Sequence, residues 1–380
     1  MQTEFEPATE NAALKAAIIE RIRRESGVSF RDFMQMALYE PALGYYCTGR
    51  ETMGRGGDYL TSPEVSPLFG AMLGRQLREM WELLGAPSVF DILEAGAGNG
   101  TLCRDVLSWA QRTEQELFAA TQYTIVEPVP ALEAKQRDRI AGDGLDAHVE
   151  WIADLPNRID GCILTNELLD SMPVHRVAMT DGALREIYVN SDGARFFEEP
   201  RDAATDVHRY FQTLQLLPGA GCRAEVNLEA PAWIRKAGSA LKRGFVLTFD
   251  YGYEGRDLYA PWRADGTLLC FYQHNPSTDP YARIGRQDMT SHVDFTTLRE
   301  AGEKAGLTTA AVTSQAEFLT NLGIADALPP PEGEIDLEER LARRRAVSEL
   351  IDPAGLGRIK VLAQSKGVGA VHLRGFAADA

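Results

Sequence analysis

The sequence is poor in residues that could hold a metal ion or form disulfide bonds. Its five cysteines lie far apart and form no C-x-x-C pair, and its six histidines show no spacing typical of metal ligands. We therefore predict that the protein has no metal site. We expect its cysteines to be reduced thiols in the cytoplasm, where disulfide bonds are rare.

The sequence also lacks an excess of basic residues and any long apolar run. Lysine and arginine number 39 against 55 acidic residues, which gives a net charge of −16. Because nucleic-acid binding needs a basic surface, general DNA or RNA binding is disfavoured. No apolar run approaches the roughly 20 residues that span a bilayer, and the polar start of the chain is unlike a signal peptide. The composition is that of a globular protein.

One stretch of the chain has the pattern of a buried strand, a tight turn and a helix. An apolar run ends at Glu94, Gly96, Gly98 and Gly100 follow, and apolar residues then recur at helical spacing. Glycine allows the backbone angles of such a turn and the close approach of a ligand to the main chain. The dinucleotide fingerprint G-x-G-x-x-G would need a glycine where the chain has Thr101.

The pattern found instead, E-x-G-x-G-x-G, resembles motif I of class I S-adenosylmethionine (SAM) methyltransferases. The alternative is a structural glycine turn in some other α/β protein. A second acid, Glu127, ends the next apolar run and is placed to accept hydrogen bonds from both ribose hydroxyls of a cofactor. Without the glycine motif, Glu127 would be interpreted as a solvated strand end.

Two more predicted strands end in polar clusters, Asp154 with Leu155 and then Asn166. Strands that alternate with helices predict an α/β fold with a doubly wound parallel sheet, whose ligand lies at the carboxyl ends of the strands. We therefore add these three residues to the candidate cofactor site.

A polar, glycine-rich segment at residues 45–64 precedes a strongly amphipathic helix that begins after Ser66. Its apolar content is too low for a core. We expect it to fold over the cofactor through Thr61, Ser62 and Glu64. A connector that is disordered without ligand is the alternative interpretation.

The order of these patterns divides the chain into four segments. At position 174 the alternation of strands and helices gives way to short antiparallel strands with Asp-Gly turns. We expect an N-terminal helical cap with the cofactor-covering loop at 1–86 and the first part of the Rossmann-like core at 87–173. An inserted α+β substrate subdomain at 174–230 and the rest of the core, with C-terminal helices, at 231–380 follow.

Several blocks of sequence resemble the MidA-like family of SAM-dependent methyltransferases, over nearly the whole chain. They are residues 57–70, 166–174, 249–252, 288–295 and 361–363. The resemblance implies the class I methyltransferase fold, SAM as cofactor and a protein arginine as acceptor. Mitochondrial members of this family are complex I assembly factors that methylate an arginine of a core subunit, so a respiratory-complex subunit is the implied partner. Residues 268–274 depart from the family's L-R-x-Y-x-x-H run, which predicts a different acceptor pocket.

The catalytic candidates are acids and a histidine near the predicted strand ends. Methyl transfer from a sulfonium is an in-line displacement that depends on alignment of the acceptor, and carboxylates pair well with a guanidinium. Glu167, Asp170, Asp250 and His274 are therefore candidates. Alternatively, the first two acids cap a helix, Asp250 holds a turn and His274 is structural. Three functions stay open, namely protein arginine methylation, methylation of a small molecule, and a non-catalytic assembly role.

Overall fold

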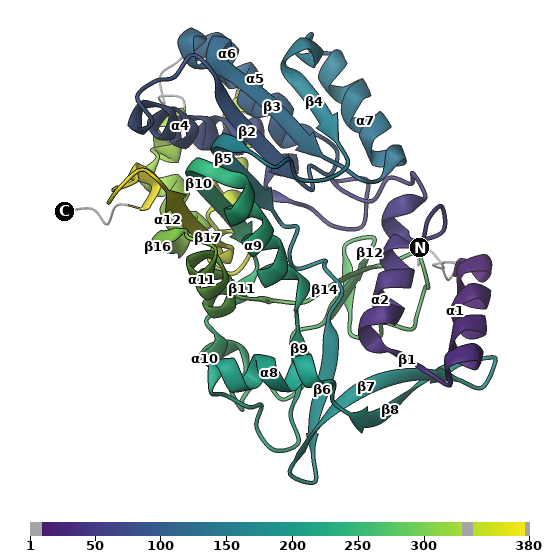
Figure 1. The fold of residues 1–380 in the computed structure, drawn as a ribbon. Coiled ribbons are helices and arrows are strands. Elements are labelled where there is room, and N and C mark those ends of the chain that lie inside the picture. The colour runs from purple at the N-terminus through teal and green to yellow at the C-terminus, as the bar shows by residue number, and fades with distance from the viewer. Residues whose placement is uncertain (1–9, 329–336, 377–380) are drawn as a thin grey trace.

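The structure is a computed structural model that describes residues 10–328 and 337–376, and a seven-stranded sheet forms its centre (Figure 1). The strand order is β4-β3-β2-β5-β10-β17-β16, in which β17 is antiparallel to both neighbours and the first five strands are parallel. The strands are β2 (Phe90–Ala95), β3 (Thr121–Val126), β4 (Val149–Ile152), β5 (Ile159–Asn166), β10 (Leu241–Asp250), β16 (Thr308–Ser314) and β17 (Lys360–Lys366). The predicted Rossmann-like parallel strands are confirmed, whereas β16 and β17 were not predicted.

Helices cover both faces of this sheet because alternate side chains of each strand point to opposite faces. Ile92 and Leu247 belong to a core with α4, α5, α6, α7, α12 and α13, whereas Leu93 and Val246 pack against α9 and α11. The helices are α4 (Pro67–Leu83), α5 (Thr101–Thr113), α6 (Gln115–Ala120), α7 (Pro130–Ala141), α9 (Glu229–Ala240), α11 (Phe295–Lys304), α12 (Gln315–Asn321) and α13 (Leu337–Leu350). The charged stretch at 329–345 is predicted to begin as a linker and to become a helix. The helix is α13, and residues 329–336 lie outside the described residues.

A second sheet is antiparallel and packs against the two N-terminal helices (Figure 1). It has the order β1-β7-β6-β9, and β8 pairs with β7. Its elements are β1 (Val28–Ser29), β6 (His175–Thr180), β7 (Ala183–Ser191), β8 (Phe196–Asp202), β9 (Arg223–Val226), α1 (Ala12–Glu25), α2 (Phe30–Tyr39) and the neighbouring α8 (Thr205–Leu214). The N-terminal helices and the segment after residue 174 therefore share one core, and the division into four segments stays a proposal.

Short elements connect the two sheets. β12, β13 and β14 form a small antiparallel sheet, and β11 pairs with β15. Their bounds, with those of the short helices, are β11 (Gly252–Tyr253), β12 (Leu269–Tyr272), β13 (Asn275–Ser277), β14 (Asp288–Thr290), β15 (Val293–Asp294), α3 (Ser62–Val65), α10 (Gly255–Leu258), η1 (Tyr45–Cys47), η2 (Asp146–His148), η3 (Ile324–Ala327), η4 (Leu356–Arg358) and η5 (Arg374–Phe376). None of the described helices has the length and apolar character needed to cross a membrane.

Candidate active site

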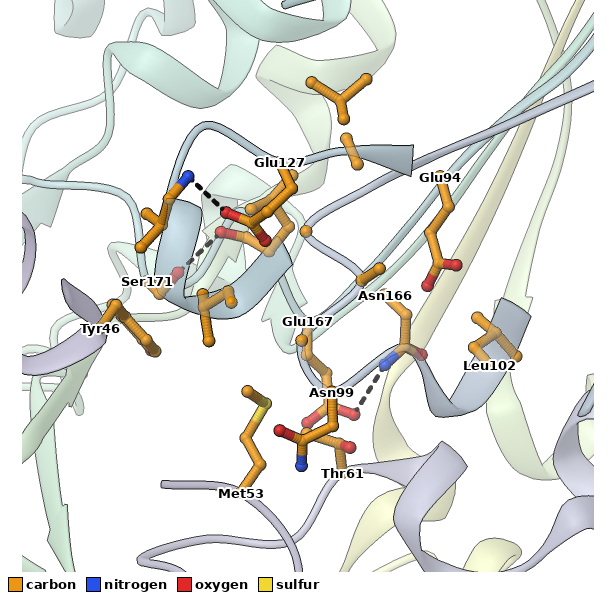
Figure 2. Close-up of a pocket in the computed structure, with 18 of the residues that line it drawn as sticks. Tyr46, Met53, Thr61, Glu94, Asn99, Leu102, Glu127, Asn166, Glu167 and Ser171 are labelled. Atoms are coloured by element: carbon orange, nitrogen blue, oxygen red, sulfur yellow. Dashed lines mark hydrogen bonds between the residues drawn. The ribbon is translucent and has the colours of Figure 1, made fainter. Parts of the chain in front are cut away.

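A first cavity of about 310 Å³ lies where the central parallel strands end (Figure 2). The turn after β2 and the ends of β3 and β5 form its walls, and the loop before α4 adds a further wall. The chain passes from β2 to β3 and β4 on one side, and then returns to β5 on the other side of β2. Ligands of doubly wound sheets bind at such a reversal of strand order.

The glycine turn after β2 needs glycine for two separate reasons. Gly96, Gly98 and Gly100 have φ angles of +73°, +54° and +77°, which L side chains rarely adopt. A Cβ atom at Gly96 would lie 2.7 Å from the side chain of Leu168, and one at Gly98 would lie 2.7 Å from the sulfur of Met53. Gly96 and Gly98 line the first cavity. Gly100 does not line it and instead precedes the first residue of α5.

Two buried carboxylates, Glu94 and Glu127, line the first cavity as the sequence predicted. Glu94 accepts a hydrogen bond from the Tyr123 hydroxyl at 2.7 Å, and burial raises the pKa of Glu94 to about 7. Glu127 accepts bonds from the Val129 amide and from Gln136 Nε2, both at 2.9 Å, and burial raises its pKa. Because a carboxylate can accept about four hydrogen bonds, each keeps capacity for a ligand.

Of the two residues predicted at the end of β4, Asp154 and Leu155, only Asp154 lines the first cavity. Asp154 lines the first cavity, but its carboxylate is largely exposed and pairs with Lys236. Leu155 does not line this cavity, because its side chain packs against the core beneath α9 and α11. Leu155 is therefore a correction to the predicted cofactor site.

The loop before α4 reaches the first cavity with some of the predicted residues. Thr61 and Glu64 line the cavity, and Glu64 accepts hydrogen bonds from Asn99 and Thr101 next to the glycine turn. Ser62 does not line the cavity, because its hydroxyl is buried and donates to Gln315 Oε1 at 2.8 Å. Ser62 is thus a second correction to the predicted cofactor site.

The prediction that this loop is too polar to contribute to a core is wrong, since Tyr45 and Met53 are buried. Its polar centre is Asp58, which is also buried and ion-pairs with Arg50. The Asp58 carboxylate accepts hydrogen bonds from the Tyr45 hydroxyl at 2.8 Å and from the Gln273 amide at 2.9 Å. These partners allow the loop to be buried without a large apolar content.

A second cavity of about 280 Å³ adjoins the first and shares Tyr46, Tyr59 and Glu167 with it. Four carboxylates line this second cavity. They are Asp58, Glu167, Asp170 and Asp288. His274, another predicted catalytic residue, also lines it, and the His274 backbone N–H donates to the Asp58 carbonyl oxygen at 2.8 Å.

Glu167 stands between the two cavities in a left-handed conformation with φ of +51°. Such a conformation is costly for a residue with a side chain and is often found at functional sites. Its Oε1 atom accepts hydrogen bonds from Asn166 Nδ2 at 3.1 Å, drawn as a dashed line between the two labelled residues in Figure 2, and from the Ser62 amide at 3.2 Å. Burial raises the pKa of Glu167 to about 7.

The pKa values of Asp288 and Asp170, which also line the second cavity, are raised as well. Asp288 accepts hydrogen bonds from the Tyr46 hydroxyl at 2.7 Å and from the Met289 amide at 2.9 Å, while burial raises its pKa to about 6. Burial and the neighbouring charge of Asp250 raise the pKa of Asp170 well above its ordinary value. The second cavity thus holds three acids, Glu167, Asp170 and Asp288, whose pKa values are raised chiefly by burial.

Asp250 is a correction to the predicted catalytic set. It is fully buried and lines neither of these two cavities. Its carboxylate accepts hydrogen bonds from the backbone N–H groups of Leu169 at 2.8 Å and Tyr251 at 2.9 Å. Asp250 therefore joins the end of β10 to the loop after β5, which is the turn-holding role kept open from the sequence.

Tyr46, Asp58, Tyr59 and Asp288 are among the side chains of the second cavity that sequence reasoning missed. All but Tyr46 fall inside two of the family-like blocks, at 57–70 and 288–295, which was the available signal. The departure at residues 268–274 lies in this same wall. Leu269 and Phe271, at the arginine and tyrosine positions of the family's run, line the second cavity.

Comparison with known proteins identifies relatives along most of the chain. Residues 72–313 match the model of a family described as putative S-adenosyl-L-methionine-dependent methyltransferases. The chain is 31% identical to the mitochondrial protein arginine methyltransferase NDUFAF7 homolog of Drosophila melanogaster, over 90% of this chain and 82% of that protein. The human mitochondrial protein arginine methyltransferase NDUFAF7 is 28% identical, over 80% and 72%.

A solved structure resembles this fold closely. It is the crystal structure of a Burkholderia thailandensis protein bound to S-adenosyl-homocysteine, with 34% identity, a TM-score of 0.87 and coverage of 97% of this chain and 95% of that chain. A native crystal structure of a protein of the same superfamily from B. thailandensis has a TM-score of 0.86.

The names of these curated relatives contradict the cytoplasmic location predicted from the cysteines, because the relatives are named as mitochondrial proteins. All five cysteines are free thiols. Free thiols fit any reducing compartment, so they could not decide between one such compartment and another.

Proposed function

The chain belongs to the family of putative SAM-dependent methyltransferases, and from this premise we propose that it methylates an arginine side chain of a protein. It is a SAM-dependent methyltransferase with the class I fold, and a relative of 34% identity binds S-adenosyl-homocysteine. Its curated relatives are named protein arginine methyltransferases, which supports arginine as the acceptor. The family resemblance further supports a respiratory-complex subunit as the protein that carries this arginine.

The first cavity has the features that a cofactor of this kind needs. The turn of Gly96 and Gly98 lets a ligand approach the backbone, and Glu127 can accept hydrogen bonds from ribose hydroxyls. Asn166 Oδ1 is buried without a hydrogen-bond partner in the described structure, on a residue that lines the first cavity. A buried acceptor of this kind is costly unless a ligand donates to it, and the ammonium group of SAM is a suitable donor. SAM supplies the electrophilic methyl group.

The observation that carries the arginine proposal is the acid-rich second cavity beside the cofactor cavity. A guanidinium is planar and always charged, and it pairs with carboxylates in bidentate geometry. Asp170 and Asp288 line the second cavity but not the first, so we propose that these two acids orient the guanidinium. A cation placed there would offset the mutual repulsion of the acids.

Glu167 is the residue we assign to the nitrogen that receives the methyl group, because it alone among these acids lines both cavities. Its carboxylate would hold that nitrogen at the shared wall and accept the proton that the methylated guanidinium loses. A pKa of about 7 suits this exchange near neutral pH. Tyr46 and Tyr59 also line both cavities and would limit the access of water.

The test is incubation of the protein with tritiated SAM and a host lysate, followed by separation of protein from small molecules and acid hydrolysis of the labelled protein. Radioactive methylarginine supports the proposal, and mass spectrometry of the labelled band identifies the acceptor. Label confined to small molecules would instead show a different acceptor class. Tight SAM binding without any transferred label would favour a non-catalytic assembly role.

We expect Glu127→Ala to weaken SAM binding by about 1.5 to 3 kcal/mol, the usual contribution of hydrogen bonds to a charged group. Isothermal titration calorimetry measures this loss, and the melting temperature of the variant shows whether the fold is kept. The matched control is Glu150→Ala, which removes an exposed carboxylate from the neighbouring strand β4. Equal SAM affinity in both variants would make Glu127 a structural strand end.

Hydrogen exchange in residues 54–64 is expected to slow when SAM is added. Met53, Tyr59, Thr61 and Glu64 line the first cavity, so a bound cofactor would hold this loop in place. Exchange mass spectrometry with and without SAM measures the effect, with α8 as an internal reference that lines neither cavity. Identical protection of the loop in both states would contradict its role as a cofactor-covering segment.

A further inference from the structure

A third cavity of about 290 Å³ adjoins the acid-rich cavity. It shares Tyr251, His292 and Arg358 with the second cavity and none of its lining residues with the first. The acid-rich cavity therefore adjoins both of the others. A substrate whose arginine enters the acid-rich cavity would place neighbouring residues near the third cavity.

The third cavity differs from the second in its charge, because Arg358 and Lys360 both line it. Neither side chain takes part in an ion pair within the part of the chain that the structure describes. Arg358 is an exposed residue, and its guanidinium carbon lies 5.3 Å from the centre of the Tyr251 ring. Two cations without ion-pair partners at one site contrast with the net charge of −16 of the whole chain.

The acids that line the third cavity form no ion pair with Arg358 or Lys360 in the part of the chain that the structure describes. Glu254 is already paired with Arg299 and also accepts a hydrogen bond from the Thr296 hydroxyl. Asp257 is exposed on α10. His292, which faces both cavities, has a pKa lowered to about 4 by burial, so its ring is neutral near pH 7.

The position of Arg358 creates an electrostatic problem for a cationic acceptor. Arg358 lines the second cavity as well as the third, so its positive charge opposes a guanidinium there. An anion bound next to Arg358 would remove this repulsion while filling the third cavity. An acidic side chain of the substrate protein is the anion that arrives together with the arginine.

We propose that the third cavity is a specificity subsite in which Arg358, with Lys360, binds an aspartate or glutamate of the substrate protein close to the methylated arginine. The proposal rests on the proposed function, because it places the arginine in the second cavity. An extended chain advances about 3.3 Å per residue. Since the two cavities share walls, the acidic residue is within about three residues of the arginine.

The experiment uses the full chain loaded with S-adenosyl-homocysteine and fluorescent peptides that carry one central arginine. Each peptide has either aspartate or asparagine at one of the three positions on either side. Fluorescence anisotropy is expected to show about twofold to fivefold tighter binding for aspartate at one position, the size of an exposed charged contact. Arg358→Gln should abolish this preference, and Arg358→Glu should transfer it to a peptide with lysine at that position.

The control variant is Arg112→Gln, in which the lost arginine is exposed at the end of α5 away from the glycine turn. It should keep the wild-type preference for aspartate. Equal binding of aspartate and asparagine peptides by the wild-type protein, or a preference unchanged in Arg358→Glu, would overturn the subsite. The same peptides are then tested with tritiated SAM. An Arg358-dependent preference without methyl transfer would support the subsite and refute arginine methylation, so the two failures are distinct.

Discussion

Asp170→Asn is expected to lower the rate of methyl transfer about 10²-fold or more, with little change in SAM affinity. Asp170 lines the acid-rich cavity and not the cofactor cavity, so its loss affects the orientation of the acceptor alone. Burial raises the pKa of Asp170 well above its ordinary value, so the ionised form costs stability in the empty protein. Asparagine removes that cost, and the melting temperature should not fall.

Single-turnover assays with tritiated SAM measure the rate, calorimetry measures SAM affinity, and a thermal melt measures stability. The matched control is Asp160→Asn, because Asp160 lies near the start of β5, the strand that precedes Asp170, and its partly exposed carboxylate pairs with Arg158. This control should retain wild-type transfer. Wild-type transfer by Asp170→Asn would refute its catalytic assignment and favour a structural role.

Glu167→Gln is expected to lower methyl transfer by at least about 10²-fold and to remove a titration from the pH profile. In the wild-type protein, burial raises the pKa of Glu167 to about 7, and only its carboxylate form can balance a guanidinium. The value of kcat/KM, which reports on the free enzyme, should therefore rise as pH increases through about 7. In the variant, the remaining rate should be flat in this region.

Glu94 also has a pKa raised to about 7, so Glu94→Gln is the necessary comparison. If the rise of kcat/KM near neutral pH persists in Glu167→Gln and disappears in Glu94→Gln, the titrating group belongs to the cofactor site.

The raised pKa values of Glu94 and Glu167 also make the stability of the fold depend on pH. Since the folded state holds these protons more tightly than the unfolded state, the free energy of unfolding should fall as pH rises from about 4.5 to about 7.

Local patterns in the sequence were enough to predict the parallel strands and their helices. The amphipathic helix expected after Ser66 is α4, and the Ser66 side chain caps its start. The antiparallel strands β16 and β17 were missed. β17 pairs with β16 and with β10, both of which are far from it in the sequence. It therefore lies between these two strands in the sheet, although it is the last strand of the chain. Such pairing leaves no local turn signal of the kind that marks a hairpin.

The candidate site was predictable to the extent that topology determines it. Parallel strands end at one edge of a sheet, so Glu94, Glu127 and Glu167 were expected to lie near one cavity, and they do. Asp58 and Asp288 come from a loop and a three-residue strand, whose positions depend on contacts far apart in the sequence. Asp250 also ends a strand, but its carboxylate accepts hydrogen bonds from backbone N–H groups and does not reach either cavity.

The contacts of Asp58 have a consequence for how the two ligands influence each other. Asp58 joins the loop over the cofactor cavity to Gln273 and His274 at the wall of the acceptor cavity. A ligand that orders the loop therefore also reduces the freedom of that wall, so the second ligand meets a site already partly ordered. Thermodynamic reciprocity then requires that cofactor and acceptor raise each other's affinity by one common factor.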